Sequence, residues 1–182
     1  FGRTGAWAAY EHFDVIPDLS TWAKSMGGGM PIGAVIGKQE IMDAIKPGLI
    51  GGTYLGGPLS CVASLASINY MQKNNINAAG AKVGKIVHDK FTELQRLYPD
   101  KITDVRGLGA MLAIEFTNPT TRFPDGVSAK AIVDKCLAKG LIVITSGTYG
   151  NCIRILSPLF IEDDVLAKGL FILEETIKEV LI

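Results

Sequence analysis

Lys24 is the residue whose surroundings point most directly to chemistry. It lies in an uncharged run, Thr21-Trp22-Ala23-Lys24-Ser25-Met26, that leads into three consecutive glycines. Loss of water disfavours the ammonium form, so a lysine among Trp and Met side chains can lose its proton near neutral pH. A neutral lysine amine is the nucleophile of Schiff-base catalysis. A solvated lysine ahead of a flexible turn is the simpler interpretation of this local pattern when it is taken alone.

A second candidate is the glycine-rich segment Gly51-Gly52-Thr53-Tyr54-Leu55-Gly56-Gly57. A hydroxyl group beside backbone N–H groups that neighbouring glycines leave accessible can bind an anion such as a phosphate. Loops of this composition are common, so the segment gains its weight from its position after Lys24. We therefore consider Gly52 and Thr53 as candidate anion-binding residues.

Arg154 is the third candidate, because it lies within the apolar run Cys152-Ile153-Arg154-Ile155-Leu156. A buried arginine cannot lose its charge by deprotonation and needs an anionic partner. That partner is either a protein carboxylate such as Glu115 or a carboxylate of a bound substrate, held by two parallel hydrogen bonds.

Along the chain, Asp14–Leu19 leads into Lys24, Pro31–Gly37 follows, and Gly51–Leu59 comes next. This order resembles the class III aminotransferases, which are pyridoxal phosphate (PLP) enzymes of fold type I. The resemblance covers the whole chain, and the later half is most similar to the 4-aminobutyrate (GABA) aminotransferases, chiefly through residues 145–158. It implies that Lys24 binds PLP as a Schiff base and that Gly52 and Thr53 belong to the cofactor site. It further implies a homodimer in which Thr53 reaches the PLP phosphate of the neighbouring subunit. Arg154 would bind the α-carboxylate of glutamate and 2-oxoglutarate. Members of the family usually have Asn where this chain has Gly57, so the resemblance does not predict the geometry of the loop after Thr53.

The implied reaction moves the amino group of an ω-amino acid, 4-aminobutyrate first, to 2-oxoglutarate. One alternative is an acetylornithine or other ω-amino acid aminotransferase. The other is a non-catalytic module for packing or dimerisation, because the chain begins without Met, after the place where the family carries the Asp that pairs with the PLP ring nitrogen. We therefore expect this chain to be a C-terminal portion, inactive in isolation.

Composition narrows the classes of partner. Eighteen basic residues balance 18 acidic ones, which gives no electrostatic reason to expect nucleic acid or an anionic membrane as a partner. No apolar run is long enough to span a bilayer, and the first residues do not resemble a signal peptide. Three widely spaced cysteines and two histidines predict neither disulfides nor a metal site, and are typical of a cytoplasmic protein.

The elements that must position these residues indicate an α/β fold. Strands are expected at residues 19–22, 32–36, 102–105, 110–116, 141–145 and 152–156, and Lys24 would follow the first of them. Helices are expected at residues 6–13, 38–45, 59–72, from after Asn75 through Leu97, 128–139 and 162–181, with Ser128 as an N-cap and Arg106 in a turn. Residues 1–77 would be the end of a large PLP-binding domain, and residues 78–182 a small α+β C-terminal domain.

Overall fold

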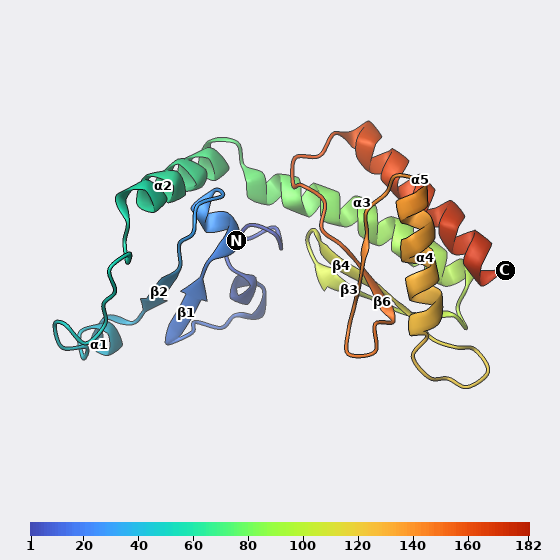
Figure 1. The fold of residues 1–182 in the computed structure, drawn as a ribbon, viewed down its shortest axis with the longest axis horizontal. Helices are drawn as coiled ribbons and strands as arrows, with labels where there is room; N and C mark the ends of the chain where they lie inside the picture. Colours follow the sequence, from blue (N-terminus) through green and yellow to red (C-terminus); the bar gives the residue numbers. More distant parts are fainter. The chain divides into compact units, whose positions relative to one another are not determined.

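The computed structural model describes all 182 residues, which form two compact units. The first contains Phe1–Gly2 and Ala6–Asn77, and the second contains Arg3–Gly5 and Ala78–Ile182. Figure 1 shows the chain coloured from blue in the first unit to red at the end of the second. The elements are mixed α and β, as the sequence predicts.

The first unit contains short elements around a two-stranded ribbon. In chain order these are η1 (Ala9–Phe13), β1 (Leu19–Trp22), η2 (Lys24–Gly27), β2 (Ala34–Gly37), α1 (Gln39–Met42) and α2 (Pro58–Lys73). Strands β1 and β2 are antiparallel and pair from Leu19 with Gly37 to Trp22 with Ala34. The predicted strand at residues 19–22 is confirmed, and Pro58 occupies the first turn of α2.

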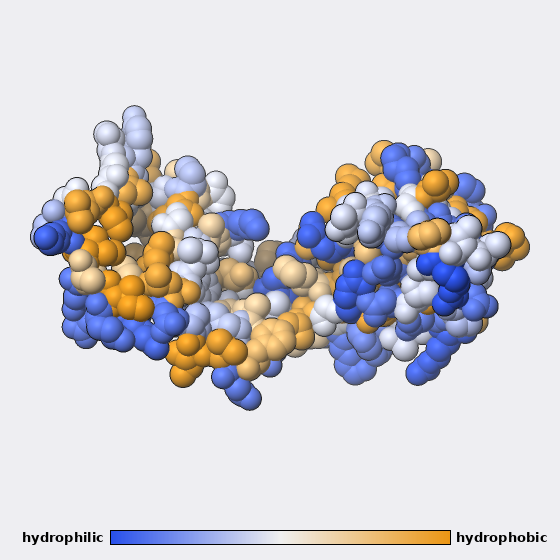
Figure 2. Space-filling view, turned by 90° about the horizontal axis from the view of Figure 1, so that it is seen from below, coloured by the Kyte–Doolittle hydropathy of each residue, from blue (hydrophilic) through white to orange (hydrophobic).

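The first unit has almost no apolar core of its own. Its buried apolar residues are Ala8, Met26 and Ile76, whereas Ile16 and Tyr54 are 85% and 93% exposed. Figure 2 shows apolar residues, in orange, at the surface of this unit. A two-stranded ribbon is marginally stable in water by itself. The first unit therefore leaves uncovered much of the apolar surface that a folded domain usually buries.

The second unit is an antiparallel sheet packed against helices. Its elements are α3 (Ile76–Leu97, which begins in the first unit), β3 (Ile102–Leu108), β4 (Met111–Phe116), α4 (Gly126–Ala138), β5 (Ile144–Ser146), β6 (Cys152–Ile155) and α5 (Asp163–Leu181). The strand order is β3-β4-β6-β5. Leu112, Ile114 and Phe116 alternate along β4 and are buried against the helices. The other face of β4 therefore carries Ala113 and Glu115.

Helix α3 joins the core through one apolar stripe. Val83, Val87, Phe91 and Leu94 recur at helical spacing and are all buried. Gly84 lies beside this stripe, and a β-carbon placed there would be only 2.1 Å from the carbonyl oxygen of Gly109. A glycine at this point lets the helix approach the turn between β3 and β4.

Several expectations about local structure were wrong. The helices expected at residues 6–13 and 38–45 are shorter, a 3₁₀ helix at Ala9–Phe13 and α1 at Gln39–Met42. Ser128 is not the N-cap of α4: Asp125 is, and its carboxylate accepts a 2.9 Å hydrogen bond from the Ser128 N–H. Arg106 lies in β3 rather than in a turn, because pairing with β4 extends to Leu108 and Gly109, at φ +50°, makes the tight turn. Strand β5 begins at Ile144 rather than at residue 141.

All three cysteines are free, and Cys136 and Cys152 are buried. None of the helices combines the length and the apolar character that crossing a bilayer requires.

Candidate active site

Lys24 lies directly after β1 and adopts a left-handed conformation. Ala23 is extended and Lys24 has φ +58°, after which η2 runs to Gly27. A side-chain-bearing residue in this region carries a strain of about 1–3 kcal/mol, which persists only where the surrounding structure enforces it. Such residues cluster at functional sites. Asp14, Asn75 and Arg122 share this positive φ, so the conformation of Lys24 is a feature that the sequence did not predict and is not by itself evidence of a role.

An aromatic cluster fixes the strand that precedes Lys24. The Trp22 ring lies edge to face with Phe1, at 5.3 Å between centroids, and with Tyr10, at 6.4 Å. The Trp22 indole N–H also donates to the Ser20 hydroxyl at 2.8 Å. This cluster was not predicted from the sequence, although Phe1, Tyr10 and Trp22 are large aromatic residues that precede Lys24 in the chain.

Helix α2 supports the glycine-rich turn that follows Lys24. A β-carbon on Gly28, which has φ +57°, would lie 2.2 Å from the Ser67 hydroxyl oxygen and 3.4 Å from the Ala63 carbonyl oxygen. Gly29, at φ +99°, has nothing within 4 Å of such an atom. Small residues on α2 therefore allow the turn to pack against the helix.

The environment expected for Lys24 is not the one observed within this chain. Its side chain is exposed and forms no ion pair or hydrogen bond. Met26 is buried and Trp22 is half-buried in the aromatic cluster, so the apolar neighbours in sequence do not enclose the amine. The extended and left-handed backbone at residues 23 and 24 sends neighbouring side chains in different directions. Lys24 is therefore a free, strained lysine rather than a desolvated one.

Thr53 is also free to bind a ligand. It is exposed, and neither its hydroxyl nor its N–H is hydrogen-bonded within the chain. The carbonyl of Gly52 accepts the N–H of Leu55 at 3.1 Å, which closes the turn around Thr53. Lys24, Gly52 and Thr53 all belong to the first unit, and Arg154 belongs to the second.

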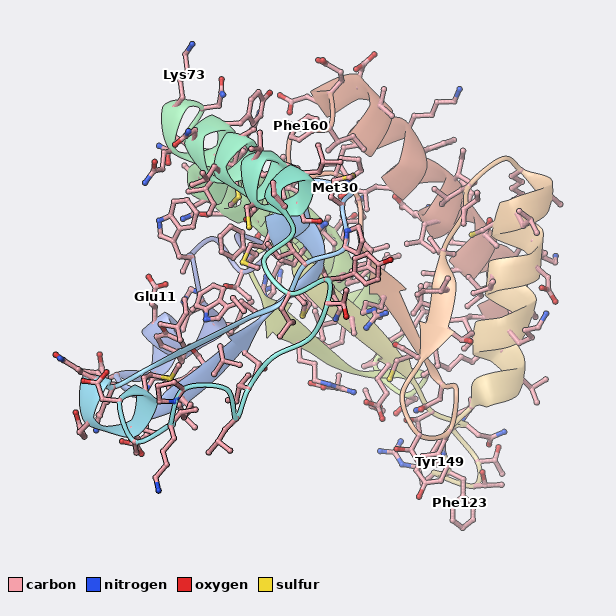
Figure 3. All side chains as sticks on the ribbon, turned by 60° about the vertical axis from the view of Figure 1, so that its left-hand side comes forward. Glu11, Met30, Lys73, Phe123, Tyr149 and Phe160 are labelled. Carbon is pink, nitrogen blue, oxygen red and sulfur yellow. The ribbon has the colours of Figure 1, made fainter.

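Arg154 lies on β6 and faces away from the helices. Ile153 and Ile155 belong to the core, so Cys152 and Arg154 lie on the opposite face of the sheet. Arg154 is opposite Ala113 on one side and Ile144 on the other. Tyr149 is exposed in the loop between β5 and β6, and Figure 3 shows it at the outer end of that loop.

The ion pair considered for Arg154 is made by a different arginine. Glu115 binds Arg106, which also binds Asp104. The second oxygen of Glu115 accepts the Asn151 amide at 3.1 Å, and the Cys152 thiol lies 3.6 Å from the carboxylate. The hydrogen bond from the Arg106 guanidinium lowers the pKa of Glu115, burial raises it, and the Asn151 hydrogen bond lowers it further. The net result is a pKa of Glu115 below its usual range. The alternative of an Arg154–Glu115 pair is therefore wrong for this structure.

Arg154 consequently keeps an unsatisfied donor. Its Nε atom is buried and has no hydrogen-bond partner, and the same holds for the hydroxyl oxygen of Ser157. Arg3 donates to the carbonyl of Ser157, has no carboxylate partner, and has its pKa lowered by burial. The guanidinium groups of Arg3 and Arg154, which have no carboxylate partner, are therefore able to bind an anion near the end of β6.

Comparison with known families decides what these residues belong to. The family model for aminotransferase class III matches residues 1–177. The chain belongs to the class III aminotransferases. As a member of this family it shares a dependence on PLP, and the α/β structure is part of fold type I.

Individual proteins that this aminotransferase chain is similar to are also aminotransferases. It is 47% identical to the "probable 4-aminobutyrate aminotransferase" of Bacillus subtilis over 96% of the chain, and 46% identical to the 5-aminovalerate aminotransferase of Pseudomonas putida over 98%. The crystal structure of acetylornithine aminotransferase from Elizabethkingia anophelis superposes with a TM-score of 0.85 at 35% identity and covers 98% of the chain. The chain spans about 40% of the length of the curated relatives it matches, and 43% of the acetylornithine enzyme.

The free groups of the first unit fit PLP chemically. An unpaired primary amine at Lys24 suits the cofactor's aldehyde, and an unpaired hydroxyl and N–H at Thr53 suit its phosphate. Thr53 directly follows two glycines, and three glycines begin three residues after Lys24, where backbone can approach a ligand closely.

Proposed function

We propose that this chain is part of an aminotransferase that moves the amino group of 4-aminobutyrate, or of a closely related ω-amino acid, to 2-oxoglutarate. The observation that supports the proposal most is what the relatives of this chain are named for. The two relatives at 46–47% identity are named as aminotransferases of 4-aminobutyrate and of 5-aminovalerate. Both compounds are linear chains with an amine at one end and a carboxylate at the other. An enzyme for them needs a reactive amine and a group that binds carboxylate.

Three regions of the chain take distinct roles in this proposal. The Nζ amine of Lys24 attaches the cofactor and then moves a proton at the substrate carbon that bears the amino group. PLP supplies the electron-withdrawing ring that stabilises negative charge at that carbon. Thr53 and the backbone at Gly52 bind the phosphate. Arg154, whose Nε lacks a partner, binds a substrate carboxylate.

The choice of amino donor can be tested by half-reactions of the PLP-loaded enzyme, followed by the absorbance of the cofactor. We expect 4-aminobutyrate or 5-aminovalerate to convert the cofactor fastest, and 2-oxoglutarate to convert it back. N-acetylornithine is the competing donor, because an acetylornithine aminotransferase shares this fold at 35% identity. Fastest conversion by N-acetylornithine would contradict the proposed substrate.

We also propose a homodimer in which Thr53 binds the PLP phosphate of the partner subunit. Mixing Lys24→Ala subunits with Thr53→Ala subunits tests this directly. If Thr53 acts across the interface, each mixed dimer contains one site with both residues intact, and activity should reappear on mixing. If Thr53 acts within its own subunit, every site keeps one defect, and mixing should restore nothing.

A further inference from the structure

We propose that Arg106 is a positioning residue that holds Glu115 away from Arg154 and so keeps Arg154 free for the substrate carboxylate. This inference rests on the proposed role of Arg154. It concerns a residue that contacts neither the substrate nor the cofactor in that proposal. Its basis is the arrangement of charges on the face of the sheet opposite the helices.

The strand register makes Arg106 and Arg154 equivalent neighbours of Glu115. Ala113 on β4 pairs with Arg106 of β3 on one side and with Arg154 of β6 on the other. Glu115 lies two residues further along β4, on the same face as Ala113. Each arginine is thus a diagonal neighbour of Glu115, about 7–8 Å away at the backbone and within reach of long side chains. The backbone alone does not decide which arginine Glu115 binds.

The neighbouring charges decide the pairing. Asp104 lies directly opposite Glu115 in the register, and like charges in this position repel each other. The Arg106 guanidinium binds both carboxylates, and its Nη2 atom also lies 3.4 Å from the Cys152 sulfur. These bonds raise the pKa of Arg106, so Arg106 stays charged, and Glu115 stays ionised beside it.

Loss of Arg106 would change the partner of Glu115. Asp104 and Glu115 would then face each other without a cation between them. The remaining guanidinium on a diagonal of Glu115 is Arg154, whose Nε has no partner. An ion pair between Glu115 and Arg154 would compete with any carboxylate that Arg154 binds. Arg106 therefore acts on substrate affinity through Glu115.

The test compares variants in the PLP-loaded enzyme that contains this chain. Calorimetry measures the Kd of glutarate, a non-reacting dicarboxylate, and steady-state kinetics measure KM and kcat for 2-oxoglutarate. We expect Arg106→Gln to weaken both Kd and KM by roughly two- to fivefold, the range for a partly exposed ion pair, with kcat little changed. Arg106→Gln with Glu115→Gln should restore wild-type affinity. Arg106→Gln with Asp104→Asn has the same net charge but retains Glu115, and should stay weak.

Controls separate this effect from simple destabilisation. Arg106→Lys keeps a cation beside Glu115 and should retain affinity, even if Arg106→Gln lowers the melting temperature. Arg96→Gln removes an exposed arginine from the last turn of α3 and should change nothing.

Each outcome has a distinct meaning. Unchanged affinity in Arg106→Gln, with weakened affinity in Arg154→Gln, would overturn the role of Arg106 and leave the proposed function intact. Equal recovery by both double variants would also overturn it, because net charge and not Glu115 would then be responsible. Unchanged affinity in Arg154→Gln would instead refute the proposed role of Arg154, and this inference with it, whereas the choice of amino donor is tested separately by the half-reactions.

Discussion

Gly28 lies directly against Ser67, so that a methyl group on Gly28 would be 2.2 Å from the Ser67 hydroxyl oxygen. The same hydroxyl donates to the Ala63 carbonyl at 2.9 Å. The contact joins the turn after Lys24 to helix α2. It therefore helps to fix the position of the backbone that follows Lys24.

We expect Gly28→Ala to lower stability and PLP retention more than Gly29→Ala. Both substitutions place a side chain at positive φ, which costs about 1–2 kcal/mol. Only Gly28→Ala also displaces the Ser67 hydroxyl and its hydrogen bond, for a further loss of about 1 kcal/mol. Melting temperature and the fraction of PLP kept after dialysis measure the two effects. Adding Ser67→Ala to Gly28→Ala should recover part of the difference. Equal losses in both glycine variants would show that the contact with α2 is unimportant.

Glu174 should give the second unit a pH-dependent stability. Its carboxylate is 15% exposed and accepts Lys178 at 2.8 Å and Lys90 at 2.9 Å. The Lys178 and then the Lys90 hydrogen bonds hold the pKa of Glu174 below its usual range. Because the folded pKa is the lower one, this stabilisation is present above the unfolded pKa of about 4.3 and disappears as the pH falls through the folded pKa.

Urea unfolding of Glu174→Gln tests this expectation. At pH 7 the variant should lose about 1 kcal/mol of unfolding free energy, and at a pH below the folded pKa of Glu174 the difference should vanish. Glu175→Gln is the matched control, because Glu175 is 44% exposed and pairs with Lys178 alone. A loss of equal size at both pH values would mean that Glu174 contributes through packing and not through its charge.

Arg154 should govern affinity for the 2-oxo acid. We expect Arg154→Ala to weaken the half-reaction with glutamate or 2-oxoglutarate by roughly ten- to several-hundredfold, since a charged hydrogen bond contributes about 1.5–3 kcal/mol and its loss strands the partner. Arg154→Lys should recover only part of this, because an ammonium lacks the planar fork. Stopped-flow half-reactions measure both. Intact glutamate turnover with a destabilised fold would assign Arg154 a structural role.

The regular elements could be predicted because their signals are local. The apolar stripe of α3, the β-type run at Leu19–Trp22 and the proline that begins α2 each depend on neighbouring residues. Ser128 was mistaken for an N-cap because Asp125 and Ser128 are both good caps, and their side chains bind each other at 2.6 Å. The extension of β3 depends on pairing with β4, which composition does not reveal.

The resemblance to the family singles out Lys24, Thr53 and Arg154 as candidate residues, and their roles stay predictions. The environment of Lys24 was not predictable, because apolar neighbours in the sequence do not enclose its amine in the structure. The choice between Arg106 and Arg154 for Glu115 depends on Asp104, which strand register alone places opposite Glu115. Such relationships follow from pairing between strands, and no local pattern encodes them.

The identity of the cofactor lysine is the most direct test of this account. Borohydride reduction of the PLP-loaded enzyme, followed by proteolysis and mass spectrometry, locates the lysine that carries the cofactor. We predict a pyridoxyl group on the peptide that contains Lys24, and none after Lys24→Ala. A pyridoxyl group on Lys38, Lys46 or Lys73 in place of Lys24 would contradict the account.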